Sequence, residues 1–472
     1  MSETLWSLFQ MKKNRKSGMN LKEDIRVIQY LGSKLQILDD IYEEIEKLLP
    51  ENGIVCDLFS GSGTVSYKLA TKYTVYANDI QEYSKVITAV LLQVGRSADT
   101  KIPDINCIFE SEEYKNNKYY LQNLFTDALK HEREILDNTD YEALAELCEL
   151  NLFYDGSEVE DKKINRAKEI FGRSYDCFSK DFLDASRNST DKYSLFSLYF
   201  LNSYFSLEQC IEIDSIRYAI DRLYSKGLIE EYVFNLYLSC LIHAVSEVVS
   251  SVGKNFAQPI KVINKNGELK SFAIRRCMRD RKMNLKPHMN DMFIRLTKLK
   301  TSQNFNKVFC KNFSDVLNID DMKNVSVFYL DPPYTIDHYS RFYHVLETLV
   351  KYDYPELEKK KFNGRIRIMN GRYRDDRFQS NFCIPSKGYS EFNMLIKKIH
   401  SLGAKIVLSY SDDDSEKDTR KRVVSKDELI DILGKYYKSV CVKTLDHRYR
   451  KLSAKNDNRK EMNNGELLII CE

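Results

Sequence analysis

The sequence predicts an α/β protein with a doubly wound sheet that is interrupted along the chain by a mostly helical insertion. Residues 54–77 have the order of a βαβ unit: a strand, a glycine-rich turn, a helix and a second strand. Strands and helices alternate again from about residue 305. The stretch between is charged and rich in Asn and Tyr, with apolar residues at helical spacing. We therefore expect a sheet domain made of residues 21–96 and 305–472, with an inserted domain at 97–304.

The composition is that of a globular protein without an overall charge signal. The 472 residues, 43% hydrophobic and 30% charged, suffice for two or three folding units. There is no apolar run of membrane-spanning length and no signal-peptide pattern, so we expect a cytoplasmic protein without a membrane partner. Eleven scattered cysteines without a C-x-x-C pair indicate free thiols and no metal site. Because the net charge is only +3, any nucleic-acid surface must be local.

The beginning of the chain combines a basic arm with an anion-binding signal. Residues 1–20 lack apolar periodicity and hold a Lys/Arg cluster, which predicts a flexible arm, with phosphate contact as the alternative. Apolar residues at helical spacing then continue to residue 48, and Gly32-Ser33-Lys34 stands where this helix is expected to open. The triplet is either an N-cap or a site for an anion such as a ligand carboxylate.

A glycine-rich turn follows the first strand. Gly61 and Gly63 let a ligand approach the backbone, and the next helix points its N–H groups at the same place. Asp79 ends the second strand, 22 residues after Asp57, where an acid commonly binds ribose hydroxyls. The turn lacks the third glycine of the dinucleotide fingerprint and the Gly-Lys-Ser/Thr of a P-loop. The sequence therefore gives no sign of a pyrophosphate site.

The insertion ends in a basic stretch. Residues 275–300 hold nine Lys or Arg against two acids, a pattern typical of a solvated helix face or of a phosphate-binding surface. Residues 150–195 have a weaker pattern, which indicates loops or partial disorder. Helices are expected near residues 117–150, 160–172, 207–225 and 229–251.

An apolar strand that stops at Asp331 carries the strongest chemical signal. Two prolines follow it, and neither can donate to a ladder or continue a helix. The Asp331 carboxylate and the Pro332 carbonyl are two acceptors, and Tyr334 offers a flat face. Such a set suits a planar exocyclic amine, whose two hydrogens need acceptors and whose ring needs a stacking partner. The alternative is a tight loop with a capping Asp.

Aromatic and basic residues follow this motif. Tyr339, Phe342 and Tyr343 add aromatic surface near the predicted site. Residues 359–388 carry a lysine triplet and five arginines, which predict a mobile basic loop and a second candidate nucleic-acid contact. Helices are then expected at 389–401 and 426–437, and strands at 405–410, 438–443 and 466–470.

In this order the motifs resemble the alpha group of DNA adenine-N6 methyltransferases, the Dam-like enzymes and their restriction-associated relatives. The matching segments are residues 30–34, 57–63, 79, 331–334 and 466–469. The resemblance implies a Rossmann-like class I AdoMet-dependent methyltransferase fold, with the insertion as target recognition domain. It assigns catalysis to Asp331, Pro332, Pro333 and Tyr334. It assigns AdoMet binding to Tyr30, Gly32, Lys34, Asp57, Phe59, Gly61, Gly63, Asp79, Asn312, Phe313 and Asp331, with Asn312 standing where an Asp is more usual.

The implied reaction is methyl transfer from S-adenosyl-L-methionine to N6 of an adenine flipped out of double-stranded DNA. The role is that of the modification enzyme of a restriction-modification system, with a restriction endonuclease acting separately and the chain itself a monomer. Because RNA adenine and protein glutamine methyltransferases share the four-residue run, they remain alternatives. A catalytically inactive DNA-binding module on the same fold is a further alternative.

Overall fold

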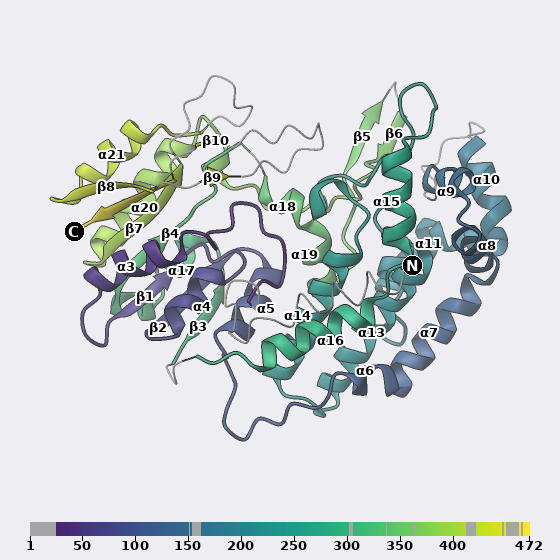
Figure 1. The fold of residues 1–472 in the computed structure, drawn as a ribbon, viewed down its shortest axis with the longest axis horizontal. Coiled ribbons are helices and arrows are strands. Elements are labelled where there is room, and N and C mark those ends of the chain that lie inside the picture. Colours follow the sequence, from purple (N-terminus) through teal and green to yellow (C-terminus); the bar gives the residue numbers. More distant parts are fainter. Residues whose placement is uncertain are drawn as a thin grey trace, which may run out of the picture.

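The computed structural model describes most of the chain (Figure 1). The predicted arm at 1–20 lies outside the described residues. No helix in the described part is long and apolar enough to cross a membrane. The same residues contain no group of three or more His, Cys, Asp or Glu side chains placed to hold a metal ion. The structure describes residues 25–150, 152, 162–301, 305–336, 338–362, 365–411, 422–445, 448–449, 462–463 and 466–472.

A seven-stranded mixed sheet forms one end of the molecule, on the left of Figure 1. The strand order is β3-β2-β1-β4-β7-β11-β8. The first five strands run parallel, and β11 is antiparallel to both of its neighbours. As predicted, the strands come from both sides of the long helical stretch. They are β1 (Ile54–Asp57), β2 (Thr74–Asp79), β3 (Lys307–Cys310), β4 (Val325–Leu330), β7 (Lys405–Ser411), β8 (Val440–Leu445) and β11 (Glu466–Cys471).

Helices cover both faces of this sheet. Successive apolar side chains of its buried strands point to opposite faces, so both faces need a covering layer. In β4, Val327 and Tyr329 join the apolar cluster of one face, and Phe328 and Leu330 join that of the other. The first face is covered by α3 (Leu38–Leu48) and α4 (Thr64–Ala70). The second is covered by α17 (Phe313–Val316), α20 (Gly388–Ser401) and α21 (Lys426–Gly434).

Residues 106–297 form the helical part of the molecule, on the right of Figure 1. The four predicted helical stretches are confirmed, the first of them as three helices. The expectation of loops or partial disorder at 150–195 is wrong for residues 162–187, which are largely helical because the aromatic rings of Phe171 and Phe178 pack against Phe125. Residues 151 and 153–161 lie outside the described residues. The helices are α6 (Asn106–Glu110), α7 (Glu112–Leu124), α8 (Thr126–Asp137), α9 (Tyr141–Cys148), α10 (Lys162–Phe171), α11 (Lys180–Arg187), α12 (Leu195–Tyr199), α13 (Leu207–Ser225), α14 (Glu231–Val248), α15 (Ser271–Arg281) and α16 (Leu285–Thr297).

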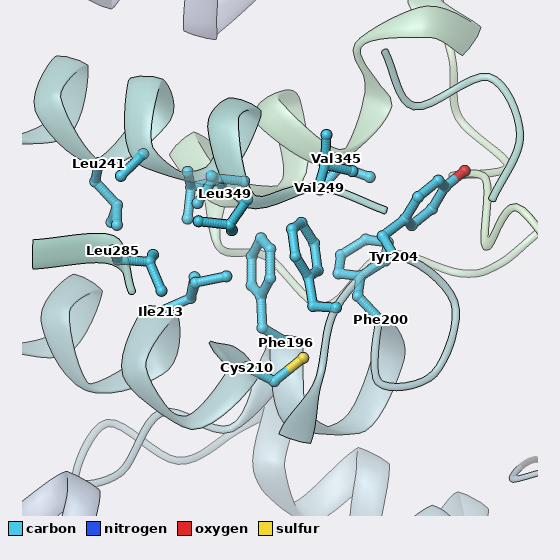
Figure 2. Close-up of a cluster of buried hydrophobic side chains, with 14 of the residues drawn as sticks. Phe196, Phe200, Tyr204, Cys210, Ile213, Leu241, Val249, Leu285, Val345 and Leu349 are labelled. Carbon is cyan, nitrogen blue, oxygen red and sulfur yellow. The ribbon is translucent and has the colours of Figure 1, made fainter. Parts of the chain in front are cut away.

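A continuous apolar core joins the helical part to the chain that follows the Pro-Pro motif. Figure 2 shows Val345 and Leu349 of α19 (His344–Lys351) in one cluster with Phe196, Ile213 and Leu241 from the helical part. Helices α14 and α19 also pack on α5 (Glu82–Leu91), which follows β2. The helical part is therefore anchored to elements that lie next to the ends of the central strands.

Candidate active site

A pocket lies at the carboxyl ends of the parallel strands. Asp57 ends β1, Asp79 ends β2 and Asp331 follows β4, and β1 lies between β2 and β4 in the sheet. Open α/β sheets bind ligands at this edge. The structure thus brings together at one pocket all the predicted site residues except Gly63, namely Tyr30, Gly32, Lys34, Asp57, Phe59, Gly61, Asp79, Asn312, Phe313, Asp331, Pro332, Pro333 and Tyr334.

The glycine turn is closed by Asp79. Its carboxylate accepts hydrogen bonds from the backbone N–H groups of Gly61 and Gln81, each at 2.9 Å. Gly63 does not line the pocket. It precedes α4 with φ +72°, and a Cβ there would lie 2.7 Å from the Thr88 hydroxyl of α5. Gly63 therefore serves close helix packing.

Gly61→Ala should weaken binding of S-adenosyl-L-methionine, the cofactor that the sequence resemblance implies, more than tenfold. Gly61 has φ +50°, and an added Cβ would lie 2.9 Å from the Tyr30 ring, so the ring must move into the pocket. Gly227→Ala is the matched control, because Gly227 has φ +68° and nothing within 4 Å of the added atom. Both variants carry backbone strain, but only Gly61→Ala displaces a neighbour. Calorimetric titration of both with S-adenosyl-L-methionine measures the difference, and equal affinities would contradict this view of the turn.

Lys34 lies between two carboxylates. Its Nζ is 3.0 Å from Asp331 Oδ1 and 2.9 Å from Glu466 Oε1, and the side chains of Lys34 and Glu466 are almost fully buried. Burial raises the pKa of Asp331 to about 6; the Lys34 ammonium lowers it and the charge of Glu466 raises it. The ammonium occupies Oδ1, so Oδ2 is the oxygen left to accept from a ligand.

The anions beside Lys34 are thus the protein's own carboxylates. The predicted helix opening at Gly32-Ser33-Lys34 is wrong, because α3 begins only at Leu38. Gly32 has φ +76°, which a helix cannot contain, and the turn that follows brings the lysine to the pocket.

Asp57 presents a buried acceptor. Its Oδ2 accepts from the Ser66 hydroxyl at 2.6 Å, while Oδ1 is buried without a hydrogen-bond partner among the described residues. Burial raises the pKa of Asp57 to about 7, Ser66 opposes this shift, and the charges of Asp331 and Asp79 add to it. An unpaired buried acceptor among acids is suited to a cationic donor such as an ammonium group.

Three aromatic rings form the apolar end of the pocket. Phe313 lies 6.1 Å from Phe59 and 5.3 Å from Phe382, measured between ring centres, and Phe382 meets Phe59 edge-on at 5.7 Å. Asn312 caps α17 by accepting from Ser314 N–H at 3.1 Å, which leaves its amide nitrogen for a ligand. The apolar surface of these rings suits a heteroaromatic base.

The sequence did not reveal Phe382, since it lies in an irregular stretch without periodicity. The loop predicted at 359–388 is wrong for its first part, whereas most of residues 369–387 has no regular secondary structure. The segment starts as a β-hairpin of β5 (Lys359–Phe362) and β6 (Arg365–Ile368). Arg374, an expected nucleic-acid contact, is buried and pairs with Asp353 and Asp376. Two acids fix this arginine in the fold.

Stacked tyrosines position the other wall. The Tyr30 ring lies parallel to Tyr343 with ring centres 5.0 Å apart, and the Tyr343 hydroxyl accepts from Leu31 N–H at 2.7 Å. Tyr334 packs on Tyr410 at 4.9 Å. The Tyr343 contacts tie the chain after the Pro-Pro motif to the segment before α3.

Ion pairs engage several cations of the predicted basic stretch. Arg281 is buried near Glu132, and Arg276 and Arg279 pair with the buried Asp280. These three arginines hold α15 in place. Arg279 is nevertheless exposed. The exposed cations without an ion pair to a described carboxylate are Arg275, Lys282, Lys286, Lys298 and Lys300, and a phosphate backbone could reach them.

The fold and this pocket define the class of amino-group methyltransferases, with a glycine turn and an Asp-Pro-Pro-Tyr motif after two adjacent central strands. Within that class, the chain matches the family of D12 class N6 adenine-specific DNA methyltransferases over residues 30–155 and 268–375. These segments contain both motifs, and the chain belongs to this family.

Individual relatives agree with this assignment. Modification methylase LlaI of Lactococcus lactis subsp. lactis is 26% identical over 435 residues, which are 92% of this chain and 53% of LlaI. Type II methyltransferase M.FokI of Planomicrobium okeanokoites is 23% identical over 81% of this chain and 44% of its own. Modification methylase StsI of Streptococcus sanguinis is 20% identical over 91% and 49%. The chain spans about half the length of each relative.

Proposed function

We propose that this chain is a site-specific DNA methyltransferase that transfers a methyl group from S-adenosyl-L-methionine to N6 of adenine in double-stranded DNA. The observation that carries the proposal is the position of Asp331-Pro332-Pro333-Tyr334, directly after the central strand β4 and across one pocket from the glycine turn. Family membership and three modification methylases among its relatives support it.

S-adenosyl-L-methionine fits the residues of the pocket. Asp57 Oδ1, a buried acceptor without a hydrogen-bond partner among the described residues, would accept from its amino group. The carboxylate oxygens of Asp79, which each accept one backbone N–H, retain lone pairs for the ribose hydroxyls. Asn312, Phe313 and the adjacent rings would hold its adenine. When bound, this cofactor supplies an activated methyl group on sulfur.

The protein's part in the chemistry is to prepare the amine. The lone pair of adenine N6 is delocalised into the purine, so the free amine is a weak nucleophile. Hydrogen bonds from its two hydrogens to Asp331 Oδ2 and the Pro332 carbonyl would localise that lone pair. Tyr334 would stack on the extruded ring, which contributes about 1–3 kcal/mol toward the cost of flipping.

The helical part is our candidate for target recognition. We place the methyltransferase domain at 21–96 and 305–472 in a class I fold, and the recognition domain at 97–304. The exposed cations of α15 and α16 would contact DNA phosphates there. We further propose that the chain is a monomeric modification enzyme whose restriction endonuclease acts separately.

The test is single-molecule sequencing of a plasmid co-expressed with the protein, scored for N6-methyladenine, beside the Asp331→Ala variant. We expect methylated adenines in one short sequence context, absent with the variant. If no plasmid carries the mark while the purified protein still binds S-adenosyl-L-methionine, duplex DNA is the wrong substrate. RNA and protein acceptors would then be tested.

The reaction should slow as the pH falls through about 6. The ionised Asp331 is a much stronger acceptor for a hydrogen of the amine than the protonated form, and burial raises the pKa of this carboxyl to about 6. kcat/KM for DNA should therefore rise with pH up to this midpoint and level off above it, measured with saturating methyl donor so that Asp57 is occupied. Asp331→Asn, which cannot titrate, should lose this limb of the profile. An unchanged profile in the variant would assign the titration to another group.

A further inference from the structure

Two arginines directly neighbour, in the sequence, residues that line the pocket. Arg341 directly follows Tyr339 and Ser340, which line the pocket from α18 (Tyr339–Phe342). Arg377 directly precedes Phe378, which lines it from another segment. The two segments are far apart in sequence, yet both guanidinium groups meet on one aromatic ring.

That ring belongs to Tyr373. The guanidinium carbons of Arg341 and Arg377 each lie 4.8 Å from its centre, and Arg341 Nη2 donates to its hydroxyl at 3.1 Å. The hydroxyl in turn donates to the Ala257 carbonyl of the helical part. Tyr373 is buried, so it fixes the directions of both arginines.

The local backbone is shaped for this arrangement. A Cβ on Gly371 would lie 2.3 Å from the Tyr373 ring, so only glycine lets the ring occupy its place. Arg372, with φ +52°, adopts the left-handed region that non-glycine residues rarely enter. These two features of the turn hold the Tyr373 ring in one place. Backbone strain of this kind is found at functional sites.

Both arginines keep donors that the described protein atoms do not satisfy. Arg341 Nε and Arg377 Nη1 are buried and have no hydrogen-bond partner among the described residues. Arg377 Nη2 pairs with Glu358 Oε2 at 2.7 Å. Arg341 has no ion pair with a described carboxylate, whereas the nearby Arg374 has two. Because both side chains are partly exposed, a ligand can reach the two guanidinium groups, and their unmet donors suit an anion with several acceptor oxygens.

We propose that Arg341 and Arg377 bind a DNA backbone phosphate next to the target adenine. A guanidinium fork matches the oxygens of a phosphate, and a nucleotide turned into the pocket brings its flanking phosphates to the pocket rim. The arginines thereby hold the extruded strand in register with Asp331. This inference rests on the proposed function, since it requires duplex DNA as the substrate.

The test combines a variant with a neutral phosphate. Once the methylated sequence is mapped, two duplexes are compared, one natural and one with a methylphosphonate beside the target adenine. Arg341→Gln should bind natural DNA about tenfold more weakly than the original protein, with the slope of log K against log salt reduced by about one. The original protein should lose a similar factor on the methylphosphonate duplex. Arg341→Gln on the methylphosphonate duplex should show no further loss, because the variant and the neutral phosphate remove the same contact.

Lys359→Gln is the matched control, since it removes an exposed cation of the nearby hairpin. Its effect should add to that of the methylphosphonate. Arg377→Gln is the second variant, should Arg341→Gln fail to fold by circular dichroism. The original protein could methylate DNA while the loss from each arginine variant adds to the loss from the methylphosphonate. For Arg341 and Arg377 alike, that result would overturn this proposal and leave the proposed function standing. If the original protein neither binds nor methylates duplex DNA, both fall.

Discussion

Replacing Asp331 with alanine should reduce kcat/KM for DNA methylation by about 10²–10³-fold, the size found when one preorganised hydrogen-bonding group is removed from a reacting centre. The alanine keeps the Pro-Pro turn and removes the acceptor for the amine. Lys34 retains its contact with Glu466 at 2.9 Å, so the pocket wall keeps one ion pair. Transfer of tritiated methyl groups to a duplex carrying the mapped sequence measures the loss.

The same variant should still bind and flip DNA. The fluorescence of 2-aminopurine placed at the target position increases when this base leaves the stack. The dissociation constant obtained from this increase should differ less than fivefold between the variant and the original protein. Tyr334→Ala should instead weaken base flipping, because it removes the stacking face and leaves the acceptor for the amine. An Asp331→Ala enzyme within tenfold of the original kcat/KM would show that this carboxylate does not prepare the amine.

Local signals in the sequence predicted the strands and most of the pocket. The strand that ends at Asp331 and the strand that ends at Asp79 were predictable, because prolines and β-branched residues act within a few positions. The shared location of these strand ends then follows from the rule that parallel strands joined by helices bring their carboxyl ends to one edge of the sheet. Thirteen of the predicted site residues line one pocket for this reason.

Contacts between distant segments were beyond the sequence. Nothing near Glu466 shows that its carboxylate meets Lys34, which lies more than four hundred residues earlier. Phe382 completes the aromatic end of the pocket from a stretch without periodicity. Charge composition alone also misjudged Arg281 and Arg374, because counting cations cannot show that Glu132 or Asp353 lies opposite. Burial and pairing are properties of the folded chain.

Replacing Lys34 with methionine should lower both stability and activity. The change leaves the buried Glu466 carboxylate and the partly exposed Asp331 carboxylate without the cation between them. Breaking a buried pair typically costs about 3–5 kcal/mol of unfolding free energy, because an uncompensated charge remains. Lys323→Met is the control, since Lys323 pairs with Asp320 at the surface and such pairs contribute little to stability. Urea unfolding of the two variants measures the difference.

The pH profile separates this electrostatic role from simple packing. Lys34 lowers the pKa of Asp331, so its removal should move the acid midpoint of kcat/KM from about 6 to higher pH. Adding Glu466→Gln removes the neighbouring charge, which should recover much of the stability and move the midpoint back toward lower pH. If Lys34→Met kept its midpoint while losing stability, the lysine would act as a packing group only. The double variant has no Lys34 ammonium beside Asp331. If its acid midpoint of kcat/KM nevertheless returns toward that of the original protein, the net charge around this carboxyl determines its pKa.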